Sequence, residues 1–202
     1  MTTLYQVPGA CSLAPLIALH AAGLDHDLQN VDLRAHKLTD GSDYYAVNAK
    51  GGVPALKLDS GEVLTENAVL LQYIADEKPD SCLIPASGTA RYRQLELLNY
   101  IATEIHKGFG PLFNPATPAE TRTMALDNLG KKFTYLSGKL DGHDFLAGDK
   151  MTAADAYFFT VLRWTDLFKI DLLPWPMIKS YRQRVAAEPA VKAALTEEGL
   201  GA

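Results

Sequence analysis

Residues 3–23 read TLYQVPGACSLAPLIALHAAG, and this stretch decides the fold of the first part of the chain. Residues 3–7 are a short run rich in strand-forming residues, which the following Pro-Gly pair breaks. Residues 12–22 predict a helix because leucine and isoleucine recur at helical spacing, and Gly23 is typical of a helix end. The stretch therefore predicts a strand, a tight turn and a helix, with Cys11 where the helix opens.

Strand and helix patterns continue to alternate after this first helix. Residues 27–32 alternate apolar and polar side chains and predict a second strand. Residues 55–58 and 62–65 flank an Asp-Ser-Gly turn and predict a β-hairpin, and residues 67–78 predict a further helix. With a short helix before the hairpin, the order is β-α-β-α-β-β-α, and its last two strands are antiparallel. We therefore predict a mixed sheet of four strands with helices.

The second half of the chain keeps a helical period to its end. Proline and serine around residues 80–88 predict a linker between two domains. Apolar residues then step by three and four along one long helix, and further helices follow. The predicted helices cover residues 95–109, 119–140, 153–168, 177–186 and 191–197. We therefore predict an α+β fold, with a sheet-containing domain at 1–79 and an all-α domain at 89–202.

Composition excludes several classes of protein. Of 202 residues, 48% are hydrophobic, which is enough to bury a sizeable core. With 19 basic and 24 acidic residues the net charge is -5, and no basic run occurs, so we expect neither nucleic acid nor a membrane as partner. No segment approaches the roughly 20 apolar residues that span a bilayer. The N-terminus lacks the pattern of a signal peptide, so we expect a cytoplasmic protein.

The two cysteines, Cys11 and Cys82, lie far apart and form neither a CxxC motif nor a metal-spaced cluster, so we predict no metal site. A structural disulfide between them stays open, although two reduced thiols are the simpler interpretation for an acidic cytosolic protein. At the start of a helix, the dipole and the free N–H groups favour the thiolate of Cys11. The alternative is a small buried apolar residue. Because Ala14 stands one turn later, a reactive Cys11 would act as a monothiol.

Val53 and Pro54 come directly before the first strand of the hairpin. A proline there suits a sheet edge or a cis turn. A cis bond would leave the N–H and C=O of Val53 free to pair with an extended peptide. The alternative is an ordinary proline that opens a strand.

Thr65, Glu66 and Asn67 open the next predicted helix. Free N–H groups at a helix start can bind a carboxylate, and the Glu66 side chain could hold an ammonium group. Together these groups would bind the head group of an amino acid. The alternative is plain capping by Thr65 or Asn67, with Glu66 favoured by the helix dipole.

Asn99, Thr103 and His106 are spaced by four and three residues, which predicts one shared face of the long helix. Lys107 adds a cation beside His106. The alternative is a solvated polar face that contains a structural histidine.

In this order and spacing, these motifs resemble the glutathione transferases of the bacterial beta type over roughly residues 3–200. The most specific stretches are residues 8–15, 51–56, 64–66 with 72–76, and 104–108. Residues 145–149 and 152–156 add a further stretch, in which Thr152 and Asp155 form a capping box. In the transferase superfamily this segment marks the central helix of the C-terminal domain.

The resemblance implies a glutathione transferase fold: a thioredoxin-like domain that binds glutathione, and a helical domain that shapes the pocket of the second substrate. Glutathione would lie extended, with its cysteinyl backbone on Val53 before a cis Pro54, its γ-glutamyl head on Glu66 and Asn67, and its sulfur near Cys11.

Residues of the helical domain and one loop residue complete the implied site. The residues that match Asn99, Thr103, His106 and the neighbouring Lys107 would also contact glutathione, with Cys11 and His106 catalytic. His36 takes a place often held by a lysine that meets the glycyl carboxylate, and the neighbouring lysine is the alternative.

The leading functional hypothesis is conjugation of glutathione to small hydrophobic electrophiles by a homodimer, with glutathione as co-substrate and no cofactor. A second enzymatic hypothesis is glutathione-dependent disulfide or peroxide reduction through a mixed disulfide at Cys11. A transferase-fold protein that binds apolar ligands, or regulates a complex without catalysis, is the non-enzymatic alternative. His20, His26 and His143 match no motif and are predicted to be surface residues.

Overall fold

The strand, turn and helix predicted at the N-terminus form as β1 (Thr2–Gln6) and α1 (Leu13–Ala22). The computed structural model describes residues 1–201. Ser12 closes the turn between the two elements, because its Oγ accepts from the backbone N–H of Val7 and donates to the carbonyl oxygen of Val7, each over 3.2 Å. These two hydrogen bonds fix the backbone on either side of Cys11, just before the first turn of α1.

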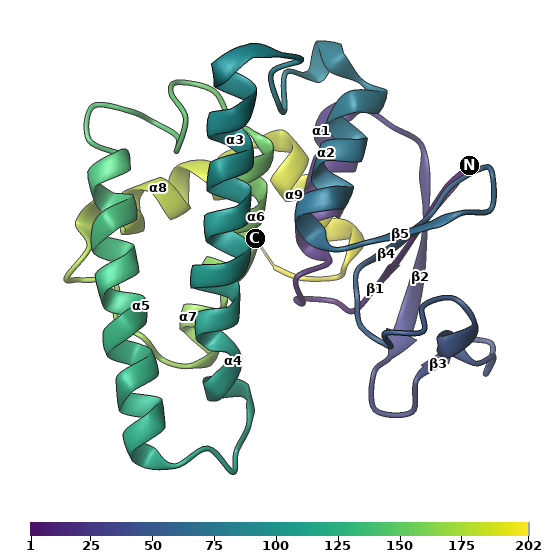
Figure 1. Ribbon diagram of the computed structural model, residues 1–202, viewed down its shortest axis with the longest axis horizontal. Helices are drawn as coiled ribbons and strands as arrows, with labels where there is room; N and C mark the ends of the chain where they lie inside the picture. The colour runs from purple at the N-terminus through teal and green to yellow at the C-terminus, as the bar shows by residue number, and fades with distance from the viewer. Residues whose placement is uncertain (202) are drawn as a thin grey trace.

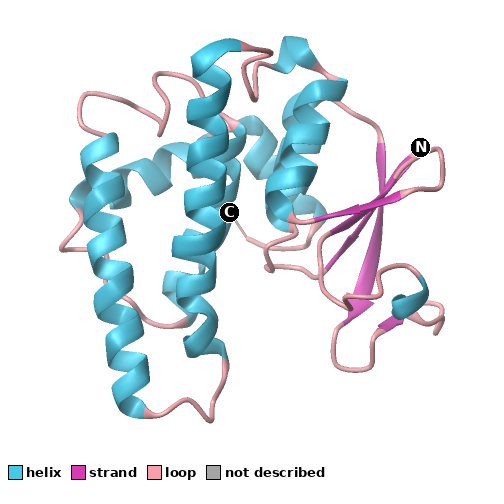
Figure 2. Ribbon diagram, viewed as in Figure 1, coloured by secondary structure: helices cyan, strands magenta, loops and turns pink. Residues whose placement is uncertain are grey.

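The sheet has five strands in the order β3-β2-β1-β4-β5, so the prediction of four strands is wrong. β2 (His26–Asp32) is parallel to β1, while β4 (Ala55–Lys57) is antiparallel to β1 and pairs with β5 (Val63–Thr65) in the predicted hairpin. The additional strand, β3 (Lys37–Leu38), extends the edge at β2 (Figure 2). Two residues are too few to show strand alternation, and only pairing with β2 makes them a strand.

The two faces of the sheet carry different cores. α1 and α2 (Asn67–Glu77) pack side by side between the sheet and the helical part of the chain (Figure 1). On the other face a small apolar cluster forms around the fully buried Tyr44, which lies in the 3-10 turn η1 (Tyr44–Ala46). Successive residues of β1 alternate between the two faces, so Tyr5 joins this cluster.

The second half of the chain is helical, as predicted. Its elements are η2 (Pro79–Ser81), α3 (Gly88–Tyr100), the π-helical segment η3 (Ile101–His106), α4 (Lys107–Phe113), α5 (Ala119–Lys139), α6 (Ala153–Leu162), α7 (Trp164–Leu167), α8 (Pro176–Ala187) and α9 (Pro189–Glu197). The long predicted helix therefore spans three consecutive elements, and the helix predicted at 153–168 divides at Arg163. Within residues 1–201, no helix has both the length and the apolar character that a bilayer crossing requires.

α6 is the centre of the helical domain, and every one of its residues is buried. The predicted capping box at its start is present: the Thr152 N–H donates to Asp155 Oδ2 over 2.8 Å, and the Thr152 hydroxyl donates to the same oxygen over 2.6 Å. The Leu146 N–H and the Tyr181 hydroxyl also donate to Asp155, over 2.9 and 3.0 Å. The buried carboxylate thus joins the start of α6 to the preceding loop and to α8.

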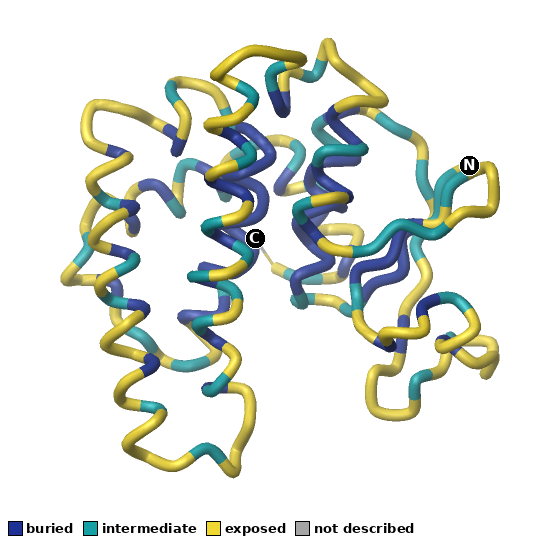
Figure 3. The backbone as a smooth tube through the Cα atoms, in the orientation of Figure 1, coloured by how far each residue is buried: buried dark blue, intermediate teal, exposed yellow. Residues whose placement is uncertain are grey.

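The apolar interiors of the two domains are continuous. α6 packs against α1 and α2 on one side and against α3 and α8 on the other. Figure 3 shows the buried backbone concentrated on α6 and on the helices beside the sheet. Because one core joins the domains, residues at the boundary between them are held in a fixed relation.

Candidate active site

A pocket of about 320 Å³ lies at the boundary between the two domains, a volume in the range of small-molecule sites. Its walls come from the turn before α1, the loop before β4, the junction of β5 with α2, the helix that continues α3, and α6. The predicted site residues that line it are Cys11, Val53, Pro54, Glu66, Asn67, Thr103, His106 and Lys107. The structure therefore brings together residues more than 90 positions apart in the sequence.

The loop before β4 presents its backbone to this pocket. The Val53–Pro54 peptide bond is cis, one of the two forms that the sequence predicts. The carbonyl oxygen of Val53 accepts from Cys11 Sγ over 3.3 Å. The preceding carbonyl, that of Gly52, is held by the Tyr44 hydroxyl and by Asn48 Nδ2, each at 2.8 Å. Side chains of η1 and of the residues that follow it thus fix the backbone of this loop.

Cys11 is only 8% exposed, and burial raises the pKa of its thiol to about 11. A hydrogen bond from the Asn67 side chain and backbone hydrogen bonds of the first turn of α1 act in the opposite direction but are outweighed. The sequence predicts a thiol biased toward thiolate, whereas burial in this structure favours the neutral thiol. The helix start is present, but close packing of both domains removes the water that would stabilise a charge. Cys11 and Cys82 are both free, so the alternative of a disulfide between them is excluded.

His106 lies across the pocket, in the last position of the π-helical segment. Burial and the neighbouring charge of Lys107 lower the pKa of its imidazole to about 4, so the ring is neutral at pH 7. Its Nδ1 is 2.7 Å from the hydroxyl oxygen of Tyr157, and its ring stands edge-on to Trp164 with centroids 5.0 Å apart. Contacts with Tyr157 and Trp164, both in the helical domain, therefore fix the orientation of the imidazole.

Glu66 and Asn67 lie at the junction of β5 and α2. Glu66 has a φ of 74°, a positive value that is unfavourable for residues other than glycine. Its carboxylate is paired with Lys50, with Oε1 and Nζ 2.5 Å apart. Asn67 is 6% exposed, and its Oδ1 is buried without a hydrogen-bond partner within residues 1–201. An unpaired buried acceptor at a pocket wall is available to a ligand.

Two predicted site residues do not line this pocket. The ring of His36 stacks on Tyr45, with centroids 4.4 Å apart, and both rings pack over Gly51, where a Cβ would come within 2.7 Å of Tyr45 Cε1. Asn99 is exposed on α3. The spacing argument for Asn99 assumed a regular α-helix, whereas the π-helical segment that follows it has more residues per turn and changes the angular position of Thr103 and His106. Contact of glutathione with His36 and Asn99 stays a prediction.

Sequence reasoning missed further residues of the pocket, namely Asn48, Lys50, Ala102 and Tyr157. Tyr157 has a sequence signal that could have been used: it is a tyrosine in a largely apolar helix, and a buried tyrosine hydroxyl needs a partner. Lys50 has no such signal, because its proximity to Glu66 depends on the path of the loop before β4.

Comparisons with known proteins agree across nearly the whole chain. Residues 9–77 match the glutathione S-transferase N-terminal domain family, and residues 100–189 match the glutathione S-transferase C-terminal domain family. The chain is 48% identical over 198 residues to glutathione S-transferase GstA of Escherichia coli O157:H7, with 98% of each chain covered.

Two solved structures give the same result. A sphingomonad glutathione S-transferase complexed with glutathione is 44% identical, with a TM-score of 0.93 and coverage of 98% of this chain and 100% of that one. The beta-class glutathione S-transferase of Sphingomonas chungbukensis is 43% identical, with a TM-score of 0.93 and the same coverage.

Proposed function

The chain belongs to the glutathione S-transferase family, in its beta class, and on that premise we propose that the pocket at Cys11 binds glutathione and presents its sulfur to small hydrophobic electrophiles. The observation that carries this proposal is the convergence of Cys11, Val53, Asn67 and His106 on one pocket between the two domains.

Backbone groups of the pocket suit an extended tripeptide. The N–H and carbonyl of Val53 would pair with the cysteinyl residue of glutathione, whose N–H shares the Val53 carbonyl oxygen with the Cys11 thiol. The N–H groups at the start of α2 and the side-chain NH2 group of Asn67 would donate to the γ-glutamyl carboxylate, while Asn67 Oδ1 would be left for a donor of the ligand. The γ-glutamyl ammonium would compete with Lys50 for the Glu66 carboxylate, which is exposed to solvent and reachable.

His106 would favour the thiolate of bound glutathione by donating a hydrogen bond. Burial raises the pKa of Tyr157, so its hydroxyl stays protonated and can donate to Nδ1 of His106. An imidazole that accepts at Nδ1 carries its proton on Nε2, and this N–H would donate to the sulfur. An imidazole with a pKa of about 4 is a weak base, so the thiol proton would pass to solvent rather than stay on His106.

The proposed reaction is a single displacement. The glutathione thiolate attacks the electrophilic carbon, a C–S bond forms, and the bond to the leaving group breaks with its electron pair. The positive charge of Lys107, which lines the pocket, and the N–H groups at the start of α1 beside Cys11 would favour the charged sulfur.

Disulfide or peroxide reduction is a second candidate because a free thiol, Cys11, lies in the pocket. In that reaction the Cys11 thiolate would attack a disulfide sulfur, release one thiol and form a mixed disulfide, which a glutathione thiolate would then reduce. The pKa of about 11 places this reaction second to conjugation at neutral pH. A non-enzymatic role is not favoured, since close relatives across the full chain are glutathione S-transferases.

We also propose that the protein works as a homodimer in the cytoplasm, where a reducing environment keeps Cys11 free. Sedimentation at micromolar concentration should give about twice the chain mass of 22.0 kDa. A monomer under those conditions would contradict the dimer without affecting the proposed chemistry.

The test of the proposed function combines binding with turnover. The protein should be retained on immobilised glutathione and should conjugate a chromogenic aryl halide, and His106→Ala should lower kcat/KM by about tenfold or more. If the protein is retained on immobilised glutathione but conjugates none of a panel of electrophiles, the enzymatic proposal is contradicted.

A further inference from the structure

Two histidines and a glutamate converge on the side of the molecule where the two domains meet, outside the active-site pocket. They are His20 in the last turn of α1, His26 at the start of β2, and Glu197 at the end of α9. None of them lines the pocket at Cys11. The prediction that His20 and His26 are plain surface residues is wrong, because only 25% and 8% of their side chains are exposed.

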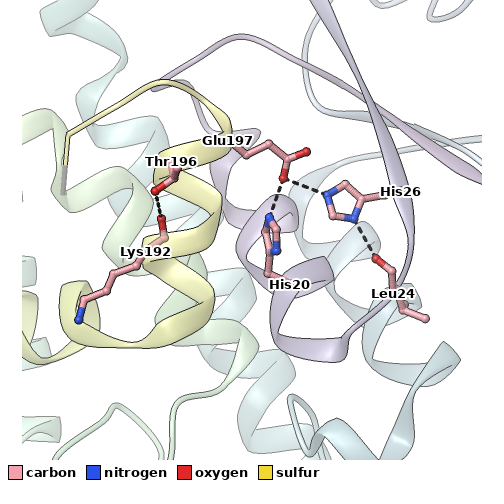
Figure 4. A network of polar contacts seen from close by, with 6 residues as sticks. All are labelled: His20, Leu24, His26, Lys192, Thr196 and Glu197. Atoms are coloured by element: carbon pink, nitrogen blue, oxygen red, sulfur yellow. Dashed lines mark hydrogen bonds and ion pairs between the residues drawn. The ribbon is translucent and has the colours of Figure 1, made fainter.

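Both imidazoles point at the same carboxylate oxygen (Figure 4). Nε2 of His20 is 2.7 Å from Glu197 Oε2, and Nε2 of His26 is 3.3 Å from it. The two rings meet edge to face, with centroids 5.1 Å apart and an interplanar angle of 89°. One donor atom from each of the three residues lies within 4.8 Å of the other two.

The second nitrogen of His26 fixes its tautomer. Nδ1 of His26 is 2.8 Å from the carbonyl oxygen of Leu24, and a carbonyl only accepts, so the proton of neutral His26 is on Nδ1. Its Nε2 then directs a lone pair at Glu197 Oε2, and two acceptors face each other at 3.3 Å. A proton on Nε2 or a metal ion between the two atoms removes this conflict, and an Nδ1–H bound to a backbone carbonyl is one of the usual supports of a metal-binding histidine.

We infer that His20, His26 and Glu197 form a binding site for one Zn²⁺ ion, with water as the fourth ligand. Two imidazole nitrogens and one carboxylate oxygen are ligands that zinc prefers, at distances of about 2.0–2.2 Å. Tetrahedral coordination at those distances separates ligands by about 3.3 Å. The pair formed by His26 and Glu197 already has this spacing, and the pair formed by His20 and Glu197 needs to widen by about half an ångström.

The position of the site gives it a structural role. Its ligands join α1 and β2 of the sheet-containing domain to α9 of the helical domain. The residue after Glu197 is Glu198, whose Oε2 accepts from the backbone N–H of Gly9 over 2.8 Å, in the turn that leads to Cys11. A zinc ion on Glu197 would therefore stabilise the end of α9 where it holds the active-site turn.

The test uses the untagged full chain, stripped of metal and titrated with Zn²⁺ and with Co²⁺ as a spectroscopic probe. We expect one equivalent to bind, the melting temperature to rise with Zn²⁺, and the Co²⁺ adduct to show tetrahedral visible bands without a thiolate charge-transfer band. His20→Gln, His26→Gln and Glu197→Gln should each weaken binding at least tenfold. His143→Gln is the matched control, because His143 faces Asp149 at 3.8 Å on an exposed surface and should bind as the wild type does.

A readout on the wild type alone guards against variants that fail to fold. In nitrogen-resolved NMR spectra of the histidine rings, Zn²⁺ should shift Nε2 of His20 and His26 and leave His106 unchanged. Three results would overturn the inference: no saturable binding of Zn²⁺ by the wild type, Zn²⁺ affinities of all three variants equal to that of the wild type, or a thiolate band in the Co²⁺ spectrum. The first result would mean that the cluster holds no metal ion, the second that the metal binds elsewhere on the chain, and the third that it binds at a cysteine.

Discussion

The hydroxyl oxygen of Tyr157 lies 2.7 Å from Nδ1 of His106, and this contact joins the buried central helix of the second domain to the pocket. The two residues are 51 positions apart, on α6 and on the π-helical segment. Their rings are nearly perpendicular, with an interplanar angle of 86°. Tyr157 is thus placed to fix which nitrogen of His106 carries the proton.

Tyr157→Phe tests this arrangement, because it removes the hydroxyl and keeps the ring. The loss of one hydrogen bond, about 1 kcal/mol, should lower kcat/KM for conjugation by roughly five- to tenfold. Steady-state kinetics with an aryl halide provide the measurement. Tyr100→Phe is the control: Tyr100 is half-buried and does not line the pocket, so this variant should keep the wild-type rate. If both variants keep the wild-type rate, Tyr157 does not position His106.

The raised pKa of Cys11 predicts a steep pH dependence of its reaction with glutathione disulfide. Below a pKa of about 11 the thiolate fraction grows about tenfold with each pH unit, so the rate of adduct formation should rise about tenfold for each pH unit between pH 7 and 10. Intact-protein mass spectrometry of a Cys82→Ser protein follows the adduct at Cys11 alone. A rate that is flat over this range would mean that the helix start stabilises the thiolate, as the local sequence predicts.

Cys11→Ala should separate the two proposed chemistries. The variant should lose mixed-disulfide formation in the pocket but keep measurable conjugation, because glutathione supplies the attacking sulfur and Cys11 only its surroundings. His106→Ala should weaken conjugation more, since it removes the N–H that is proposed to donate to the glutathione sulfur. Both activities are measured on the same preparations. Conjugation abolished in Cys11→Ala, with folding intact by circular dichroism, would make Cys11 essential to conjugation itself.

Thr152→Ala should destabilise the whole helical domain. The change removes the N-cap of α6 and one of the donors to the buried Asp155, at a cost of about 1–2 kcal/mol. The melting temperature should fall by about 2–4 °C for each kcal/mol. Thr123→Ala is the control, because the Thr123 hydroxyl bonds only the exposed turn of α5. A melting temperature equal to that of the control would show that the capping box contributes nothing.

The sequence by itself determined the features that depend on neighbouring residues. The strand, turn and helix around Cys11, the hairpin of β4 and β5, and the capping box at Thr152 each involve residues a few positions apart. Local hydrogen bonding and apolar spacing are sufficient to specify such features. The order of these elements was sufficient to predict the α+β fold with a helical second domain.

Only the tertiary structure decided what depends on distant parts of the chain. The pKa of Cys11 is set by burial under both domains, and the helix start that the sequence reveals is too weak to reverse it. Thr103 and His106 are turned away from the face of Asn99 by a π-helical segment that no spacing rule anticipates. His20 and His26 reach Glu197 across 177 and 171 residues. Local patterns in the sequence predict helices and strands, but contacts between residues so far apart in the sequence form only when these elements pack together.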